Sequence, residues 1–282
     1  MNLADIRTLE KLLTAEGFSF KKSLGQNFLI DPSVCPAMAK AASTPTTGVL
    51  EIGPGVGVLT KELARVAKKV VAIELDERLK RILPKTLADF DNIKVIFADA
   101  MKIDLKKLIH DEFAECDEVC VCANLPYYIT SPIIMHLLES RLPISSITVM
   151  VQKEAAERLC ATVGSREAGA VSVAVSYYSE PQILFEVDRS AFMPPPNVDS
   201  AVIKLNIREN PPVELKNEEK FFRFVKACFA QRRKTLVNTI SNTLKVPKDE
   251  LRAALAEENL GETVRSEQLT LQQLANLANK LF

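Results

Sequence analysis

Strand-like segments alternate with helical patterns along most of this chain, and that alternation is the feature that most constrains its fold. Seven short runs rich in apolar and β-branched residues recur between turn residues, which is typical of buried strands. Helical patterns fill the first gaps between them, so the sequence predicts an α/β fold with a mostly parallel, doubly wound sheet. The seven runs are Val49–Ile52, Val70–Glu74, Lys94–Ala98, Val119–Ala123, Ile147–Gln152, Ile183–Val187 and Ala201–Asn206.

The last two runs are connected differently from the others. The proline-rich stretch Phe192–Pro196 leaves no room for a helix between them, so we expect an antiparallel pair at the sheet edge. After Pro211-Pro212 the pattern becomes purely helical. The sequence therefore predicts a sheet domain over residues 1–210 and a small all-helical domain over residues 211–282, with helices at Glu218–Ala230, Thr235–Leu244 and Ser266–Leu281.

A glycine-rich turn, Gly53-Pro54-Gly55-Val56-Gly57, follows the first run, and Glu74 ends the second. In such a unit the glycines let the main chain approach a nucleoside, and the acid accepts hydrogen bonds from both ribose hydroxyls. Val58 stands where a dinucleotide fingerprint has its third glycine, which disfavours a nicotinamide cofactor. The absence of a Gly-Lys-Ser or Gly-Lys-Thr loop disfavours a nucleoside triphosphate. The alternative is a merely structural turn, because such turns are common in this architecture.

Four of the expected strands end in glycine or polar residues, namely Gly53, Glu74, Asp99 and Asn124. Ligands collect at the carboxyl ends of the strands in an open α/β sheet, so these residues predict a binding site. Asp99 can accept a hydrogen bond from an adenine amino group, which would place an adenosine between Glu74 and Asp99. The alternative for Asp99 is the N-cap of a helix over Met101–His110.

The stretch Asn124-Leu125-Pro126-Tyr127 narrows the chemistry further. An amide oxygen and a main-chain carbonyl can accept both hydrogens of an exocyclic amino group, and a Tyr offers a face for a planar base. This pattern predicts an adenine N-methyltransferase. The chemistry needs no general base, since a methylated and protonated aromatic amine loses its proton to water, and His110 and His136 are both isolated.

Composition excludes several other classes of protein. Lys plus Arg equals Asp plus Glu at 36 each, so binding of nucleic acid must come from local basic clusters. No apolar run reaches the ~18 residues of a membrane span, so we expect a soluble, cytoplasmic protein. The six cysteines have no recognised metal-ligand spacing, which favours buried thiols over a metal site.

Several motifs in matching order give the chain a specific resemblance, from about Lys21 to the helical region at its end. It resembles the bacterial small-subunit ribosomal RNA adenine dimethyltransferase family. This resemblance implies a class I S-adenosylmethionine-dependent methyltransferase domain with a Rossmann-like sheet, followed by a small helical domain. It also implies dimethylation of two adjacent adenosines in a hairpin loop near the 3′ end of small-subunit RNA. The motifs are Gly25–Leu29, Glu51–Gly55, Asn124–Tyr128, Gln152–Glu154, Phe192–Ser200 and Gln231–Leu236.

The resemblance also implies roles for individual residues. Asn27 and Leu29, which the residue patterns gave no reason to choose, contact the S-adenosylmethionine from an N-terminal arm. The methyl donor is further expected to contact Gly53, Glu74, Asp99 and Asn124. Asn124 and the Leu125 carbonyl accept the N6 hydrogens of the target, which turns the nitrogen lone pair toward the methyl group. Because two methyl groups are added, we expect some conformational freedom around Asn124.

Aromatic and basic residues complete the expected site. Tyr127 is expected to stack on the extruded adenine and Phe192 to cover its other face, with core packing as the alternative for both. RNA contacts are expected from Lys21, Lys22, Arg232, Arg233 and Lys234, whose alternative is an ordinary solvated cluster. The expected partner is small-subunit rRNA within the 30S particle, bound by a monomer.

Three other functions remain open at this stage. The chain could act mainly as a non-catalytic ribosome assembly factor, or as a nicotinamide oxidoreductase, which the glycine spacing disfavours. A related enzyme class dimethylates one adenosine of large-subunit rRNA and confers macrolide resistance. Its pattern after the Asn-Leu/Ile-Pro-Tyr core differs from Tyr128–Ser131 here. The loop at residues 164–169 also departs from the first family, because Ala168 precedes Gly169 where an aromatic residue is common.

Overall fold

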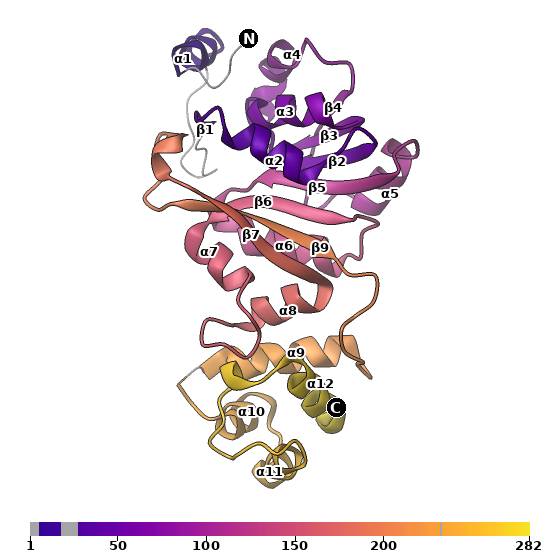
Figure 1. Cartoon of the computed structure of the whole chain (residues 1–282), viewed down its shortest axis with the longest axis vertical. Helices are drawn as coiled ribbons and strands as arrows, with labels where there is room; N and C mark the ends of the chain where they lie inside the picture. The colour runs from indigo at the N-terminus through magenta and orange to yellow at the C-terminus, as the bar shows by residue number, and fades with distance from the viewer. Residues whose placement is uncertain (1–5, 18–27, 232) are drawn as a thin grey trace. The chain divides into compact units, whose positions relative to one another are not determined.

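The computed structural model describes residues 6–17, 28–231 and 233–282, and it divides the chain into two compact units (Figure 1). The first unit comprises the described residues up to Ala156 together with Gln182–Ile207. The second comprises Glu157–Pro181 and Arg208–Phe282. The second unit therefore includes a segment that precedes the expected boundary near Asn210.

The first unit is built on a seven-stranded sheet with the order β4-β3-β2-β5-β6-β9-β7. The pairs from β4 to β6 are parallel, whereas β9 runs antiparallel to β6 and lies beside the edge strand β7. The predicted mostly parallel sheet with an antiparallel edge pair is thus confirmed. The strands are β2 (Thr47–Ile52), β3 (Lys69–Glu74), β4 (Ile93–Phe97), β5 (Glu118–Asn124), β6 (Ser146–Gln152), β7 (Ser179–Val187) and β9 (Ser200–Ile207).

Short elements and helices connect these strands. A separate two-stranded antiparallel sheet pairs β1 (Phe28–Leu29) with β8 (Phe192–Met193), and β8 lies inside the connection that was expected to leave no room for a helix. The helices are α1 (Ile6–Ala15), α2 (Val34–Ala42), α3 (Val58–Val66), α4 (Leu83–Thr86), α5 (Leu105–Glu112), α6 (Thr130–Glu139) and α7 (Lys153–Leu159). The described connections also contain the 3-10 turns η2 (Glu77–Arg81), η3 (Tyr127–Ile129) and η4 (Arg189–Ala191).

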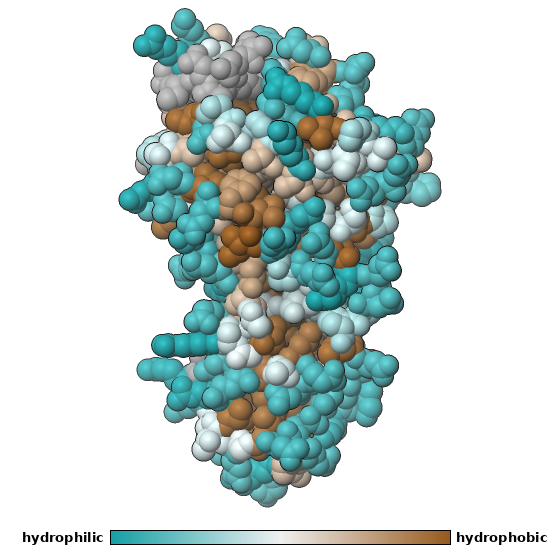
Figure 2. All heavy atoms as spheres, in the orientation of Figure 1, coloured by the Kyte–Doolittle hydropathy of each residue, from teal (hydrophilic) through white to brown (hydrophobic). Residues whose placement is uncertain are grey.

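The central strands are apolar because both faces of the sheet are covered. All six residues of β2 are buried, which is the pattern of a parallel strand beneath helices on either side. Helix α2 packs beside α3 and over β5 and β6 (Figure 1), and Met38, Leu63 and Met150 belong to the core between them. Hydrophilic side chains make up most of the molecular face that Figure 2 shows.

The cysteines of β5 belong to this core. Cys120 and Cys122 are fully buried, and burial raises the pKa of both thiols. At neutral pH they are therefore small apolar side chains, as the sequence interpretation expected. Across the described residues, no group of His, Cys, Asp and Glu side chains is placed to hold a metal ion. No helix in that part of the chain is long and apolar enough to cross a bilayer.

The second unit is helical. The Tyr177 and Tyr178 hydroxyls donate hydrogen bonds to the Glu218 carboxylate at 3.2 and 2.6 Å, which ties the first of its helices to the second. Asn217 and Thr235 cap helices close to the expected starts, whereas the helix expected from Ser266 begins at Leu271 with Thr270 as its N-cap. One further helix was not anticipated. The elements are α8 (Ala170–Tyr178), α9 (Glu218–Cys228), η5 (Phe229–Gln231), α10 (Leu236–Leu244), the unanticipated α11 (Lys248–Glu257), η6 (Ser266–Gln268) and α12 (Leu271–Leu281).

Candidate active site

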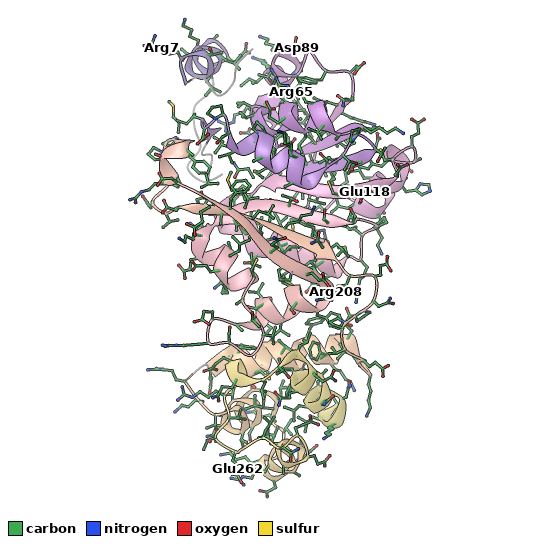
Figure 3. All side chains as sticks on the ribbon, viewed as in Figure 1. Arg7, Arg65, Asp89, Glu118, Arg208 and Glu262 are labelled. Carbon is green, nitrogen blue, oxygen red and sulfur yellow. The ribbon has the colours of Figure 1, made fainter. Side chains whose placement is uncertain are left out.

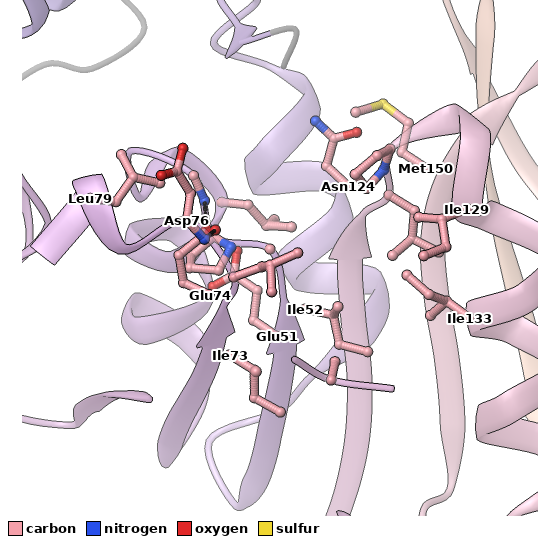
Figure 4. A pocket seen from close by; sticks show the side chains of 18 of the residues that line it. Glu51, Ile52, Ile73, Glu74, Asp76, Leu79, Asn124, Ile129, Ile133 and Met150 are labelled. Atoms are coloured by element: carbon pink, nitrogen blue, oxygen red, sulfur yellow. Dashed lines mark hydrogen bonds between the residues drawn. The ribbon is translucent and has the colours of Figure 1, made fainter. Parts of the chain in front are cut away.

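A pocket opens at the carboxyl ends of β2, β3 and β5, where open parallel sheets bind their ligands. Its lining contains the four strand-end residues that the sequence singled out, Gly53, Glu74, Asp99 and Asn124. Figure 4 shows Glu74 on one side of the pocket and Asn124 on the other. The opposite, amino end of β5 carries Glu118 (Figure 3), which accepts a hydrogen bond from the Thr47 hydroxyl at 3.1 Å.

The sheet register brings these strand ends to the same level. Glu51 on β2 lies opposite Ala72 on β3 and Cys122 on β5. Two residues further along each strand, the same register places Gly53 between Glu74 and Asn124. The tip of β5 is therefore beside the glycine turn, as a transfer between ligands at the two positions requires.

The glycine turn has a backbone that only glycine adopts readily. The φ angles are 72° at Gly53, 57° at Gly55 and 91° at Gly57, and a Cβ added at Gly53 would meet no atom within 4 Å. The space above Gly53 is therefore open to a ligand. The turn also orients Glu74, whose carboxylate accepts hydrogen bonds from Gly55 N at 3.1 Å and Asp76 N at 2.7 Å.

Glu74 is well placed as a hydrogen-bond acceptor. Its side chain is only 6% exposed, and burial raises its pKa, although the main-chain hydrogen bonds from Asp76 and Gly55 oppose that effect. Each carboxylate oxygen has two lone pairs, so oxygens that accept one backbone hydrogen bond each can still accept from a ligand. This agrees with the ribose contact expected for Glu74.

Asp99 lies two residues beyond β4 and lines the pocket, but it does not cap the next helix. The expected helix over Met101–His110 begins later, at Leu105, and its N-cap is Asp104, which accepts a hydrogen bond from Lys107 N at 3.0 Å. Asp99 instead accepts from Met101 N at 3.0 Å and pairs with the exposed Lys102 at 3.3 Å. The competing cap interpretation was thus wrong about which aspartate starts the helix.

Two oxygen acceptors are available at the tip of β5. No described residue hydrogen-bonds to the Asn124 amide, and none donates to the Leu125 carbonyl, although Leu125 N donates to Met150 O at 3.3 Å. The next carbonyl, of Pro126, is already used, since it accepts from Ile129 N at 3.1 Å and from a Thr hydroxyl in α6 at 3.2 Å. The tip of β5 therefore presents an amide oxygen and a main-chain carbonyl that no described residue occupies.

Aromatic residues form part of the pocket wall. The Tyr127 hydroxyl lies 2.7 Å from Ser200 Oγ, and this hydrogen bond fixes the direction of the ring. Burial raises the pKa of the Tyr127 hydroxyl. Phe192 is 2% exposed and belongs to the hydrophobic core, yet it also lines the pocket and pairs with Leu29 through β1 and β8. Most of the Phe192 side chain is therefore packed in the core, as the alternative interpretation expected.

The electrostatics of the pocket favour a cationic ligand. Four carboxyl groups, those of Glu51, Glu74, Asp76 and Asp99, line it, and no Lys, Arg or His of the described chain does so. Arg78 pairs with Asp76 but lies outside the lining. Phosphates are usually held by cations or by backbone N–H groups at helix N-termini, whereas a sulfonium or ammonium group is favoured by carboxylates. The lining thus argues against a dinucleotide or triphosphate.

Glu51 is a pocket residue to which the sequence interpretation gave no role. Its carboxyl is 1% exposed, and no described atom hydrogen-bonds to the buried Oε2 (Figure 4). Burial raises its pKa to about 8, and the nearby charge of Glu74 adds to the shift. An acid inside the otherwise apolar strand Val49–Ile52 was the available signal, because Glu is seldom fully buried without a partner.

The raised pKa of Glu51 predicts a specific pH dependence of stability. Because the folded pKa of about 8 exceeds the unfolded value, the folded state holds this proton more tightly. The stabilisation of the folded state by this proton is complete below about pH 4, and it is lost as the pH rises through about 8. Glu51→Gln is expected to flatten the decline in unfolding free energy between about pH 5 and 8, measured by urea unfolding with circular dichroism. The exposed Glu77→Gln is the control, and parallel profiles for wild type and Glu51→Gln would contradict the assignment.

The remaining expected contacts are only partly within the described residues. Asn27, Lys21, Lys22 and Arg232 lie outside them. Arg233 and Lys234 are exposed in the second unit, between η5 and α10, and neither forms an ion pair with another described side chain. These two cations are therefore free to contact an anion.

The chain is a class I methyltransferase, as its fold, its glycine turn, the acid at the end of β3 and the Asn-Leu-Pro-Tyr tip of β5 together indicate. This class implies an S-adenosylmethionine-type methyl donor. The chain matches the family described as ribosomal RNA adenine dimethylase over residues 17–281. The chain therefore belongs to this family of rRNA adenine dimethyltransferases.

Individual relatives agree with this membership. The chain is 50% identical over 277 residues to ribosomal RNA small subunit methyltransferase A of Geobacillus thermodenitrificans, covering 97% of this chain and 94% of the relative. It is 49% identical to the protein of the same name from Bacillus pumilus, covering 98% and 96%. Among solved structures, a dimethyladenosine transferase from Plasmodium falciparum has a TM-score of 0.73 and 29% identity, covering 89% of this chain and 95% of that one. The 23S rRNA methyltransferase ErmE has a TM-score of 0.69 and 30% identity, covering 90% and 99%.

Proposed function

We propose that this chain transfers methyl groups from S-adenosylmethionine to N6 of two adjacent adenosines in the 3′-terminal hairpin loop of small-subunit rRNA. The product is N6,N6-dimethyladenosine, made on the 30S particle by a monomer in the cytoplasm during subunit maturation. The observation that carries the proposal is the pair of free acceptors, the Asn124 amide and the Leu125 carbonyl, beside the open glycine turn.

The residues around the glycine turn fit the methyl donor. Gly53 leaves space for it, Glu74 accepts hydrogen bonds from the ribose hydroxyls, and Asp99 accepts one from the adenine amino group. Glu51 supplies a buried carboxyl for the donor's ammonium group, whose positive charge would favour the ionised carboxylate over the protonated acid that burial stabilises in the free pocket. Leu29 and Asn27 contact the donor from the N-terminal side. S-adenosylmethionine supplies an electrophilic methyl group on a positively charged sulfur, which suits a pocket lined by carboxyl groups.

The two acceptors activate the target nitrogen. The lone pair of adenine N6 is delocalised into the ring, so the nitrogen is a weak nucleophile. Asn124 Oδ1 and the Leu125 carbonyl accept its two hydrogens, which favours a tetrahedral nitrogen with its lone pair directed at the methyl group. Positive charge builds on N6 during transfer, so both acceptors stabilise the transition state more than the ground state.

Addition of a second methyl group requires a site that tolerates a changed substrate. After the first transfer N6 retains one hydrogen, so only one acceptor remains engaged. The Asn124 side chain has no hydrogen bond to any described residue, and it can therefore rotate to make room for the first methyl group. This freedom supports dimethylation by one pocket.

The target base is held by aromatic residues. Tyr127, fixed by its hydrogen bond to Ser200, stacks on the extruded adenine and offsets part of the cost of unstacking. Phe192 covers the other side with the small part of its ring that reaches the pocket. Leu29, its partner across the β1–β8 pair, lies beside it and lines the same pocket.

The small subunit is favoured over the large subunit as substrate. The relatives named small subunit methyltransferase A are 50% and 49% identical to this chain, against 30% for the 23S rRNA enzyme. The direct experiment incubates the protein with methyl-labelled S-adenosylmethionine and unmethylated 30S particles, and maps the labelled nucleosides. We expect label in dimethyladenosine at two adjacent positions of the 3′-terminal hairpin. Label in 50S particles alone, or in no RNA, would overturn the proposal.

The RNA phosphates are contacted by Arg232, Arg233 and Lys234 of the second unit, together with Lys21 and Lys22. The variant Arg233→Ala with Lys234→Ala is expected to weaken binding to 30S particles and to reduce the slope of log affinity against log salt by about 1.5 to 2. Filter binding at several salt concentrations measures both quantities. Lys106→Ala with Lys107→Ala, an exposed pair in α5, removes the same charge as a control. An unchanged slope in the first variant would remove this role.

A further inference from the structure

Two consecutive tyrosines line the pocket, and their surroundings differ sharply. Tyr127 is half-buried, and its hydroxyl is hydrogen-bonded to Ser200 at 2.7 Å. Tyr128 is 59% exposed, and its side chain hydrogen-bonds to no residue in the described ranges. Because the Tyr128 ring both lines the pocket and faces water, it is placed to contact a substrate that enters from solvent.

The local backbone directs the two rings to different places. Tyr127, Tyr128 and Ile129 form the 3-10 turn η3, in which three residues complete one turn. Neighbouring side chains therefore leave the turn about 120° apart. The same base cannot stack on both rings, so the ring of Tyr128 is available to a second planar group.

The turn that carries Tyr128 is firmly held. Ile129 N donates to Pro126 O at 3.1 Å, and Thr130 Oγ1 donates to the same carbonyl at 3.2 Å. Ile129 and Ile133 contribute apolar side chains to the pocket below (Figure 4). The backbone under Tyr128 is therefore already in place before substrate binds, which lowers the entropy lost on contact.

An RNA substrate supplies a second planar group. When one nucleotide is extruded into the pocket, the nucleotide joined to it must pass the pocket mouth and has lost a stacking neighbour. Stacking on an aromatic side chain restores that interaction and is tolerant of sequence. We propose that Tyr128 is a positioning residue that stacks on the base next to the target adenosine. This inference rests on the proposed function, since it requires an extruded adenosine.

Steady-state kinetics on 30S particles test the role. Tyr128→Ala is expected to raise KM for the particle about tenfold or more, with kcat at saturation within about twofold and donor affinity unchanged. Tyr128→Phe keeps the ring and is expected to behave as wild type, whereas Tyr128→Leu is apolar without a ring and is expected to resemble Tyr128→Ala. Ile183→Ala, which removes another exposed apolar side chain outside the pocket lining, is the control.

A spectroscopic readout separates stacking from a structural role. Particles are reconstituted with 2-aminopurine on the 5′ or the 3′ side of the target. Wild type and Tyr128→Phe are expected to quench its fluorescence at one of these positions, and Tyr128→Ala and Tyr128→Leu are not. Equal quenching and equal KM in all variants would overturn the inference, as would a loss of donor binding in Tyr128→Ala. Absence of methyl transfer by wild type would instead refute the proposed function, so the two failures are distinguishable.

Discussion

Asn124→Ala is expected to lower the single-turnover rate of methyl transfer to 30S particles about 100- to 1,000-fold. The substitution removes a side-chain acceptor that has no hydrogen-bond partner among the described residues, and it would leave only the Leu125 carbonyl to accept from N6. Since the donor is proposed to be held mainly around Gly53, Glu74 and Asp99, its affinity is expected to change by no more than about tenfold. Rapid-quench measurement with labelled donor gives the rate, and calorimetry gives the affinity.

Two further variants sharpen this test. Asn124→Asp keeps an oxygen acceptor at the same position and is expected to retain more activity than Asn124→Ala. Asn206→Ala, at an exposed position on β9, makes the same truncation away from the pocket and is expected to match wild type. A transfer rate for Asn124→Ala within about threefold of wild type would contradict the proposed role of the amide, given the loss expected for a transition-state contact.

Glu74→Ala is expected to weaken binding of S-adenosylmethionine about 100-fold or more. The carboxylate is proposed to accept hydrogen bonds from both ribose hydroxyls, and each bond to a charged group contributes roughly 1.5 to 3 kcal/mol. Burial raises the pKa of Glu74, so it is protonated at a higher pH than an exposed glutamate. Donor affinity is therefore expected to fall as pH is lowered through that raised pKa, because the protonated acid loses acceptor capacity. Calorimetry over a pH series measures both effects.

The control for Glu74 must address its structural contacts. Its carboxylate also accepts from Gly55 N and Asp76 N, so Glu74→Ala loosens the glycine turn as well as removing a ligand contact. Urea unfolding of the variant shows how much of the fold is lost. Glu77→Ala, an exposed neighbour on η2, is expected to bind the donor as wild type does. Unchanged donor affinity in Glu74→Ala, with the fold intact, would exclude the ribose contact.

Much of the fold could be predicted because parallel strands have a distinctive local signature. The run at Val119–Ala123 is apolar throughout, and the run at Val49–Ile52 is apolar except for Glu51, which identifies both as strands buried on both faces. The helix at Lys248–Glu257 was missed, although Leu251, Ala254 and Leu255 have helical spacing and are buried. Its periodic face is short and directly follows Pro247, so the local helical signal is weak.

The amino-acid sequence alone determined the alternation of strands and helices, the glycine turn, and the polar residues at the strand ends, because each depends on neighbours within a few positions. Only the tertiary structure decided which of these residues are partners. The sheet register set Gly53 level with Asn124, and the β1–β8 pair brought Leu29 to Phe192. Only the packed core buried Glu51 with one carboxyl oxygen that accepts no hydrogen bond from the described part of the chain, since burial depends on contacts between segments far apart in the sequence.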